Sequence, residues 1–198
     1  MQVVKPSFEI LDHVDEDWVM EKLERCGRVA YKSEDRITPG SADKFLRSLI
    51  LRGHESVIEH VNLTIKFICD RGVTHELVRH RLVSYTQEST RYCDYSKNGV
   101  TFIEPPWGLN DADMSLLRLL EAYYIQKVAG GLTPQQARYF LPNGLKTEIV
   151  ATANLREWRH ILRLRTDPAA HPQMRELMLP LLIELKKRLP ALFDDIQV

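Results

Sequence analysis

The sequence predicts an α+β protein in which a small, mainly antiparallel sheet is packed by about six helices. Residues 61–69 alternate apolar and polar side chains, residues 100–104 and 145–152 are two further strand-like segments, and amphipathic stretches with helical spacing surround them. A chain of 198 residues with 44% hydrophobic residues can bury one sizeable core. We therefore expect residues 1–198 to form a single domain.

Two helices are expected before the first strand. Acidic residues 15–17 open the first helix, where they complement its dipole, and Ser41 is expected to cap the second, which Gly53 ends. The apolar residues expected on one face of the first helix are Trp18, Val19, Leu23 and Cys26. The connection that follows, residues 53–60, holds two imidazoles and two carboxylates, which local chemistry alone assigns to caps and turns.

The second half of the chain should be mostly helical. Residues 111–128 form a long helix with an apolar face for the core or a subunit contact, and Thr133-Pro134 begin a helix that carries Arg138. Asn154 opens a basic helix whose apolar residues should face inward, which leaves its cations to a groove or to solvent. Pro180 should kink the last helix or leave it locally unpaired.

Composition limits the classes of partner. Lys and Arg together number 27, as do Asp and Glu, so the formal net charge is zero and no global field attracts nucleic acid or an anionic membrane. Three cysteines without metal-like spacing and no signal-like or membrane-spanning stretch indicate a cytoplasmic protein. Any anion site must be local, and we expect no metal site.

One short segment, residues 79–92, concentrates groups that bind anions: three guanidiniums, an imidazole, hydroxyls and a carboxamide. A phosphorylated small molecule suits this mixture. If the guest is a nucleoside monophosphate, Arg91, Ser89 and Arg138 are the candidates for its phosphate. A cation such as Arg165 against the edge of a uracil ring would stabilise the anionic form of that ring.

The same segment carries a family resemblance. The pattern Arg-His-Arg-x-x-Ser-x-x-x-x-Ser-x-Arg-Tyr, read as Arg79-His80-Arg81, Ser84, Ser89, Arg91 and Tyr92, resembles the signature of the flavin-dependent thymidylate synthases, and the likeness extends over nearly the whole chain. In that family a Gly-His-Glu-x-x-x-Glu-His segment, here residues 53–60, lies against the flavin. Glu76 stands where some members have Gln, and His160 where some have Asn.

The resemblance implies roles for individual residues. Arg165 matches the arginine that ionises the uracil ring and is the implied catalytic residue. The implied dUMP contacts are Glu76, Arg79, Gln87, Glu88, Ser89, Thr90, Arg91, Arg138 and Arg165. The implied FAD contacts are His54, Ser56, Glu59, Arg79, His80, Arg81, Gln87, Asn154, Arg156 and His160.

The implied reaction is the reductive methylation of dUMP to dTMP, with methylenetetrahydrofolate as carbon donor and NADPH-reduced FAD as hydride source. The sequence has no Gly-x-Gly-x-x-Gly, so a Rossmann fingerprint does not hold the FAD. In the resembling family the flavin groove forms between subunits of a homotetramer.

Two alternatives remain open from the residues alone. The basic helix of residues 156–165 could follow a nucleic-acid backbone, although the zero net charge counts against this. A metal-dependent hydrolase could use His54, Glu55, Glu59, His60 and His75, although the two histidines of residues 75–80 are five apart and so do not share one helix face.

Overall fold

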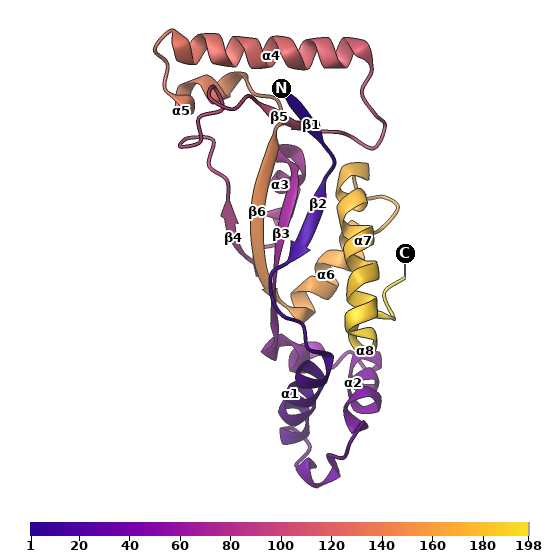
Figure 1. Ribbon diagram of the computed structural model, residues 1–198. Helices are drawn as coiled ribbons and strands as arrows, with labels where there is room; N and C mark the ends of the chain where they lie inside the picture. The colour runs from indigo at the N-terminus through magenta and orange to yellow at the C-terminus, as the bar shows by residue number, and fades with distance from the viewer. Residues whose placement is uncertain (198) are drawn as a thin grey trace. The chain divides into compact units, whose positions relative to one another are not determined.

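The computed structural model describes residues 1–197, which form two compact units. The first unit comprises Met1–Glu9, Lys66–His80 and Tyr85–Ala151; the second comprises Ile10–Ile65, Arg81–Ser84 and the chain from Thr152 onward. Helices and strands occur in both (Figure 1). The predicted α+β class is confirmed.

The strands form a four-stranded sheet with the order β2-β3-β6-β4 and a separate parallel pair, β1-β5. Their bounds are β1 Gln2–Val4, β2 Ser7–Ile10, β3 Asn62–Asp70, β4 Ser84–Gln87, β5 Thr101–Ile103 and β6 Lys146–Asn154. Strands β3 and β6 run antiparallel, because Leu155 N–H donates to the Val61 carbonyl while the hydroxyl of Thr152 bonds that of Thr64.

The three predicted strands exist but do not share one sheet. Strand β5 pairs with β1, whereas β3 and β6 lie in the four-stranded sheet, so placing residues 100–104 in the main sheet was wrong. Strands β2 and β4 were not predicted, because each has only four residues and alternates exposed with half-buried positions. Short segments of this kind carry little periodic signal.

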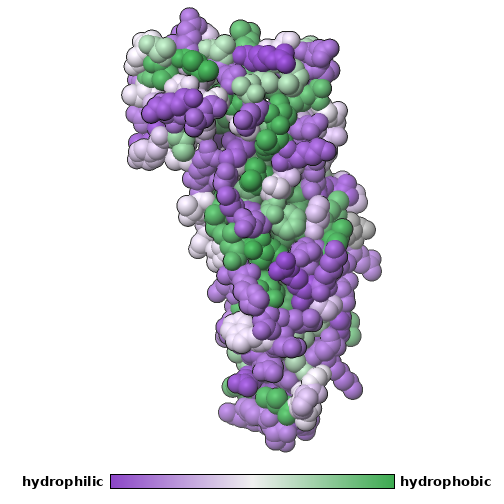
Figure 2. Space-filling view, viewed as in Figure 1, coloured by the Kyte–Doolittle hydropathy of each residue, from purple (hydrophilic) through white to green (hydrophobic). Residues whose placement is uncertain are grey.

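The first unit contains α3 (Arg71–Leu77), α4 (Asp111–Ala129), α5 (Pro134–Ala137) and η3 (Arg138–Phe140). Asn110 and Asp113 form a capping box at the start of α4. On its outer face α4 exposes Leu116, Leu119 and Tyr123. Figure 2 shows apolar side chains among hydrophilic ones on this part of the surface.

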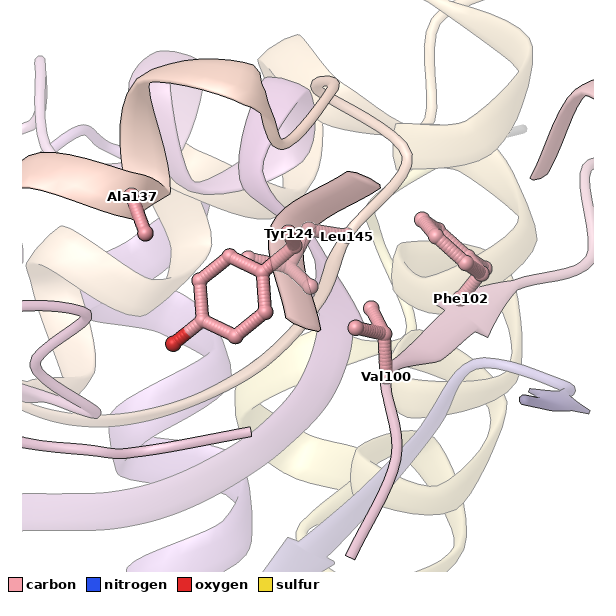
Figure 3. Close-up of a cluster of buried hydrophobic side chains, with 5 residues drawn as sticks. All are labelled: Val100, Phe102, Tyr124, Ala137 and Leu145. Carbon is pink, nitrogen blue, oxygen red and sulfur yellow. The ribbon is translucent and has the colours of Figure 1, made fainter. Parts of the chain in front are cut away.

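The inner face of α4 packs on a small core in the first unit. Tyr124, which is fully buried, meets Val100, Phe102, Ala137 and Leu145 (Figure 3). Leu117 and Val128 of the predicted apolar face are half-buried against this cluster. The cluster therefore fixes Ala137, the last residue of α5, and Leu145, which directly precedes β6.

The second unit is mainly helical. Its elements are α1 (Glu16–Val29), η1 (Glu34–Arg36), α2 (Ser41–Leu51), η2 (Glu55–His60), α6 (Leu155–Arg165), α7 (Pro172–Arg188) and α8 (Pro190–Phe193). Helix α1 lies beside α2, and α6 packs against both η2 and α7 (Figure 1). Helix α7 continues through Pro180.

Two details of the N-terminal helices differ from the predictions. Trp18 is 56% exposed, so it does not join Val19 and Leu23 in the core. Ser41 is not the cap of α2: Gly40 holds that position with a φ of 78°, a left-handed conformation that suits glycine. The Ser41 hydroxyl instead donates to the buried Glu24 carboxylate at 2.8 Å.

Among residues 1–197, none of the helices combines the length and the apolar character that a membrane span requires.

Candidate functional site

Helix α6 organises the polar site of the second unit. The Asn154 side chain accepts a hydrogen bond from Glu157 N–H at 2.9 Å and so caps the helix, as predicted. One face is fully buried and carries Trp158, Ile161 and Leu162, as the apolar spacing predicts. The opposite face presents Arg156, His160 and Arg163, which follow each other at intervals of four and three residues.

This polar face borders a cavity of about 670 Å³. Its lining consists of Glu55, Glu59, Leu82, Asn154, Arg156, Glu157, His160 and Arg163. Arg156 Nη1 lies 2.5 Å from Glu59 Oε1, and this hydrogen bond raises the pKa of the guanidinium above its ordinary value. The cavity is thus lined by two guanidiniums, three carboxylates, an imidazole, a carboxamide and one apolar side chain, and its volume lies in the range of small-molecule sites.

A buried arginine stands behind the cavity. Arg159 is fully buried, although the sequence predicted that the cations of this helix would face a groove or solvent. Its guanidinium donates to both oxygens of Asp195 at 2.7 Å, to Glu55 at 3.2 Å and to the Leu192 carbonyl. Arg163 contacts the same two carboxylates at 3.2 Å. The network therefore holds Glu55 at the cavity wall.

These pairings weigh against both alternative functions. Arg156 and Arg163 are neutralised by carboxylates and Arg159 is buried, so α6 presents no unopposed basic stripe to a nucleic acid. Glu55 and Glu59, which a hydrolase would need as metal ligands, are bound by arginines. The His54 ring is bonded through Nδ1 to the Tyr31 hydroxyl at 3.0 Å.

In the first unit, a turn follows strand β4. The Ser89 carbonyl accepts hydrogen bonds from Tyr92 N–H and Cys93 N–H, and the Ser89 hydroxyl accepts from Arg91 N–H at 3.3 Å. Upstream, Gln87 Nε2 donates to Thr74 Oγ1 of α3 at 3.0 Å. This hydrogen bond connects the predicted anion segment, residues 79–92, to α3 at a point four residues before Arg91.

Two contacts link this turn to the α5–η3 segment. Arg138 Nη1 donates to Thr90 Oγ1 at 3.1 Å, and Arg91 Nε donates to Gln135 Oε1 at 3.3 Å. Arg138 follows Ala137, which the buried cluster holds (Figure 3). Arg138 directly follows α5 and is the first residue of the 3₁₀ helix η3, so the predicted helical segment carries it.

A pocket of about 270 Å³ opens beside this contact. It is lined by Arg71, His75, Thr90, Arg138, Tyr139, Leu141, Pro142, Asn143 and Leu145. A second groove of the first unit, of about 530 Å³, is lined in part by Gln87 and Glu88. There Lys146 bridges Glu148 at 2.5 Å and Glu88 at 3.3 Å, and the Tyr95 hydroxyl donates to Glu88 at 2.7 Å.

Residues 10–191 match a protein-family model described as "Thymidylate synthase complementing protein". A flavin-dependent thymidylate synthase of Pyrococcus furiosus is 34% identical over 179 residues, which cover 86% of this chain and 71% of the relative. The chain belongs to the flavin-dependent thymidylate synthase family. The enzyme of this name from Mycobacterium tuberculosis is also 34% identical, over 199 residues that cover 89% of this chain and 79% of the relative.

A solved structure shares the fold of the family member described here. The crystal structure of a UMP/dUMP methylase, PolB from Streptomyces cacaoi, bound with 5-Br dUMP, covers 98% of this chain and 96% of its own with a TM-score of 0.79. The sequence identity is 23%. The strand and helix arrangement is therefore that of a known fold.

The residues that the resemblance to flavin-dependent thymidylate synthases assigns to FAD lie in both units. Glu59, Asn154, Arg156 and His160 line the 670 Å³ cavity of the second unit. His54 and Ser56 are exposed on or next to η2, and Arg81 is exposed beside the cavity residue Leu82. In the first unit, Arg79 is exposed, His80 is buried, and Gln87 borders the 530 Å³ groove.

The residues assigned to dUMP are distributed in the same way. Thr90 and Arg138 share the 270 Å³ pocket, Arg91 and half-buried Ser89 lie in the adjoining turn, and Glu88 lines the 530 Å³ groove. Glu76 is half-buried on α3 and Arg79 follows that helix in the chain. Arg165 is the last residue of α6 in the second unit and is half-buried.

Some lining residues were not assigned a binding role by the sequence. Arg163 lies seven residues beyond Arg156 on α6, a helical spacing that could have marked it as part of the same face. Arg71 and His75 lie four residues apart on α3 and also share a face. Asn143 gives no such signal, because only the fold brings its loop to α3.

Proposed function

We propose that this protein converts dUMP to dTMP by reductive methylation, with FAD as cofactor. The observation that carries this proposal is the 34% identity to enzymes named flavin-dependent thymidylate synthase, over 86% and 89% of the chain. The overall reaction consumes dUMP, methylenetetrahydrofolate, NADPH and a proton, and yields dTMP, tetrahydrofolate and NADP⁺. Methylenetetrahydrofolate and NADPH are the co-substrates that the family resemblance implies.

The 670 Å³ cavity is the proposed place for part of the FAD. Its residues fit such a group if Arg156 and Arg163, which are paired with Glu59, Glu55 and Asp195, turn their guanidiniums to phosphate oxygens, while Asn154 and His160 add further polar atoms. Leu82 adds an apolar contact for a ring system. When bound, FAD would supply the hydride, and the protein would orient the rings and adjust the local charge.

The proposed dUMP phosphate site lies in the first unit, around Arg138, Thr90 and Arg91. Two guanidiniums and a hydroxyl suit a phosphate monoester, and the hydrogen bonds of Arg138 and Arg91 hold both side chains in the same region before any ligand arrives. The neighbouring turn places the Ser89 hydroxyl close by. These residues bind and position the nucleotide rather than take part in bond making.

Arg165 is the proposed catalytic residue. A guanidinium against the carbonyl edge of uracil stabilises negative charge on the ring, which makes its carbon a better nucleophile toward the one-carbon donor. The position suits such a task because Arg165 ends a helix that is held in place by the buried side chains of Trp158 and Ile161. An arginine stays charged at any working pH.

We propose further that the active form is a homotetramer with sites between subunits. The outer face of α4 exposes Leu116, Leu119 and Tyr123 at helical spacing, which is an apolar row that a neighbouring copy could cover. The three cysteines are unpaired within the described chain, which fits the cytoplasm as the place of reaction. Light scattering of the Leu119→Glu variant should show a smaller particle than the parent protein.

The test is a ligand titration followed by absorbance. Protein purified with added FAD should keep the visible flavin spectrum after gel filtration, and dUMP should perturb that spectrum at saturable concentrations. The matched control is dCMP, which has the same phosphate and sugar but an amino group in place of a ring carbonyl. Colourless protein, or equal responses to dUMP and dCMP, would count against the proposal.

A further inference from the structure

The 270 Å³ pocket of the first unit differs in charge from the two larger cavities. Its lining includes two guanidiniums, an imidazole, two hydroxyls and a carboxamide, but none of the carboxylates of the described chain. The 670 Å³ cavity is lined by three carboxylates, and the 530 Å³ groove has two lysines against two glutamates. The small pocket is therefore the site with uncompensated positive charge.

Arg71 is the residue of this pocket that the sequence left without a role. Its guanidinium forms no ion pair with any carboxylate of residues 1–197, in contrast to Arg156 and Arg159. Arg71 is also half-buried. A cation withdrawn from water without a partner lowers stability, and an anionic ligand would supply the missing partner.

The backbone at Arg71 is held firmly. Its N–H donates to the Asn143 carbonyl at 2.9 Å, and its carbonyl accepts from the Thr74 hydroxyl at 2.9 Å. The same hydroxyl accepts from Gln87. Arg71 is thus fixed relative to the loop that lines the pocket and to strand β4, so its side chain starts from a preorganised position.

The opposite wall of the pocket is equally constrained. Arg138 donates to Thr90 at 3.1 Å, and Leu145, a lining residue, is held in the buried cluster with Ala137 (Figure 3). Guanidiniums that reach one small pocket from two fixed elements can each bind a different edge of a tetrahedral anion. A phosphate monoester, with three terminal oxygens, has enough acceptors for Arg71, Arg138 and Thr90 together.

We propose that Arg71 is a further substrate-binding residue, which clamps the 5′-phosphate of dUMP together with Arg138 and Thr90. This inference rests on the proposed function for the identity of the nucleotide. It assigns Arg71 to the recognition of the phosphate and to no part of the uracil chemistry. The residue should therefore distinguish a nucleotide from its nucleoside.

The experiment compares dUMP with deoxyuridine as ligands of the FAD-loaded protein. Arg71→Gln should weaken dUMP binding roughly 10- to 100-fold and leave deoxyuridine binding unchanged, while Arg71→Lys should recover part of the loss because it retains the charge. Arg118→Gln, which removes an exposed arginine of α4, is the control and should bind both ligands like the parent. A fold defect would instead weaken both ligands and lower the unfolding temperature.

Inorganic phosphate separates failure of this inference from failure of the proposed function. It should compete with dUMP in the parent protein and much less in Arg71→Gln. Unchanged dUMP affinity in Arg71→Gln, with a large loss in Arg138→Gln, would overturn the role of Arg71 and leave the proposed function standing. The parent protein could instead bind inorganic phosphate but not dUMP, with phosphate binding lost in Arg71→Gln. That result would uphold the anion site and overturn the assignment of the nucleotide.

Discussion

Arg138 donates a hydrogen bond to Thr90 across 48 residues of sequence, with 3.1 Å between Nη1 and Oγ1. This contact joins the segment with the densest anion-binding chemistry to the α5–η3 turn, and it defines one wall of a carboxylate-free pocket. The two residues belong to segments that are held by independent features: Ala137, next to Arg138, lies in a buried cluster, and Thr90 lies in a tight turn. The pocket that we propose for the phosphate is thus formed before a ligand binds.

Replacing Arg91 tests the adjoining turn. Arg91→Ala should weaken dUMP binding roughly 10- to 100-fold, the equivalent of about 1.5–3 kcal/mol for a hydrogen bond to a charged group. FAD binding should change little, because Arg91 bonds Gln135 and does not line the second-unit cavity that we propose for FAD. Paired calorimetric titrations would measure both, and an unchanged dUMP affinity would remove Arg91 from the phosphate site.

Arg165 should affect turnover rather than cofactor binding. Arg165→Ala is expected to retain FAD and to lose dTMP formation by at least about 100-fold, because the charge opposite the uracil ring is gone. Arg165→Lys should recover part of the rate, since it restores a cation with less suitable geometry. Single-turnover rates with bound FAD would show the effect; equal rates in Arg165→Ala and the parent would refute this role.

The ion pair between Arg156 and Glu59 should control FAD affinity. Arg156→Ala removes a guanidinium from the cavity wall and leaves Glu59 unpaired there, so FAD binding should weaken by roughly 10-fold or more. Arg25→Ala is the matched control, because Arg25 pairs loosely with Glu21 at 3.9 Å on the exposed face of α1. Fluorescence titration with FAD would compare them, and equal affinities in the two variants would contradict the assignment.

Asp195 should determine part of the acid stability. Burial on its own would raise the pKa of this carboxyl, but the hydrogen bonds from Arg159 and the charges of Arg159 and Arg163 lower it below its ordinary value. A carboxylate with a depressed folded pKa stabilises the protein above its unfolded pKa of about 3.9, and that stability is lost as the pH falls through the folded value. The parent should therefore lose stability steeply below about pH 4.

Asp195→Asn tests this directly. The variant should be less stable near neutral pH by roughly 1.5–3 kcal/mol, because fully buried Arg159 loses one of its two carboxylate partners and keeps only Glu55. Its stability should also depend less on pH below about pH 4. Asp194→Asn, which affects an exposed pair with Arg47, should cost less than about 1 kcal/mol. Denaturant unfolding at several pH values would measure the free energy of unfolding of both variants. Identical unfolding curves for Asp195→Asn and Asp194→Asn would contradict this role of Asp195.

Some parts of this fold follow from local sequence and others do not. In strand β3 the buried residues Leu63, Ile65 and Phe67 alternate with half-buried positions, and α6 buries Trp158 and Ile161 at helical spacing. Both elements were therefore predictable from periodicity. Strand β5 was recognised but placed in the wrong sheet, because its partner β1 lies about 100 residues earlier in the sequence. Strand pairing over such distances leaves no local signal.

The site shows the same division. The composition of residues 79–92 predicts an anion site, and Arg138 could be named as a candidate because its helix start was recognisable. Arg159 was misjudged, since its partners Glu55 and Asp195 are distant in sequence and an arginine on a helix normally faces solvent. Arg71 was missed although it shares a helix face with His75, because that spacing does not reveal that the Asn143 loop completes a pocket there.

Product analysis under turnover conditions tests the central claim most directly. Purified protein should be incubated with FAD, NADPH, methylenetetrahydrofolate and dUMP, and the nucleotides separated by chromatography. We expect dTMP to accumulate in proportion to the protein added and to disappear when FAD is withheld from FAD-free protein. Unchanged dUMP in the complete mixture, from protein that binds both FAD and dUMP, would contradict the assignment of thymidylate synthesis to this chain.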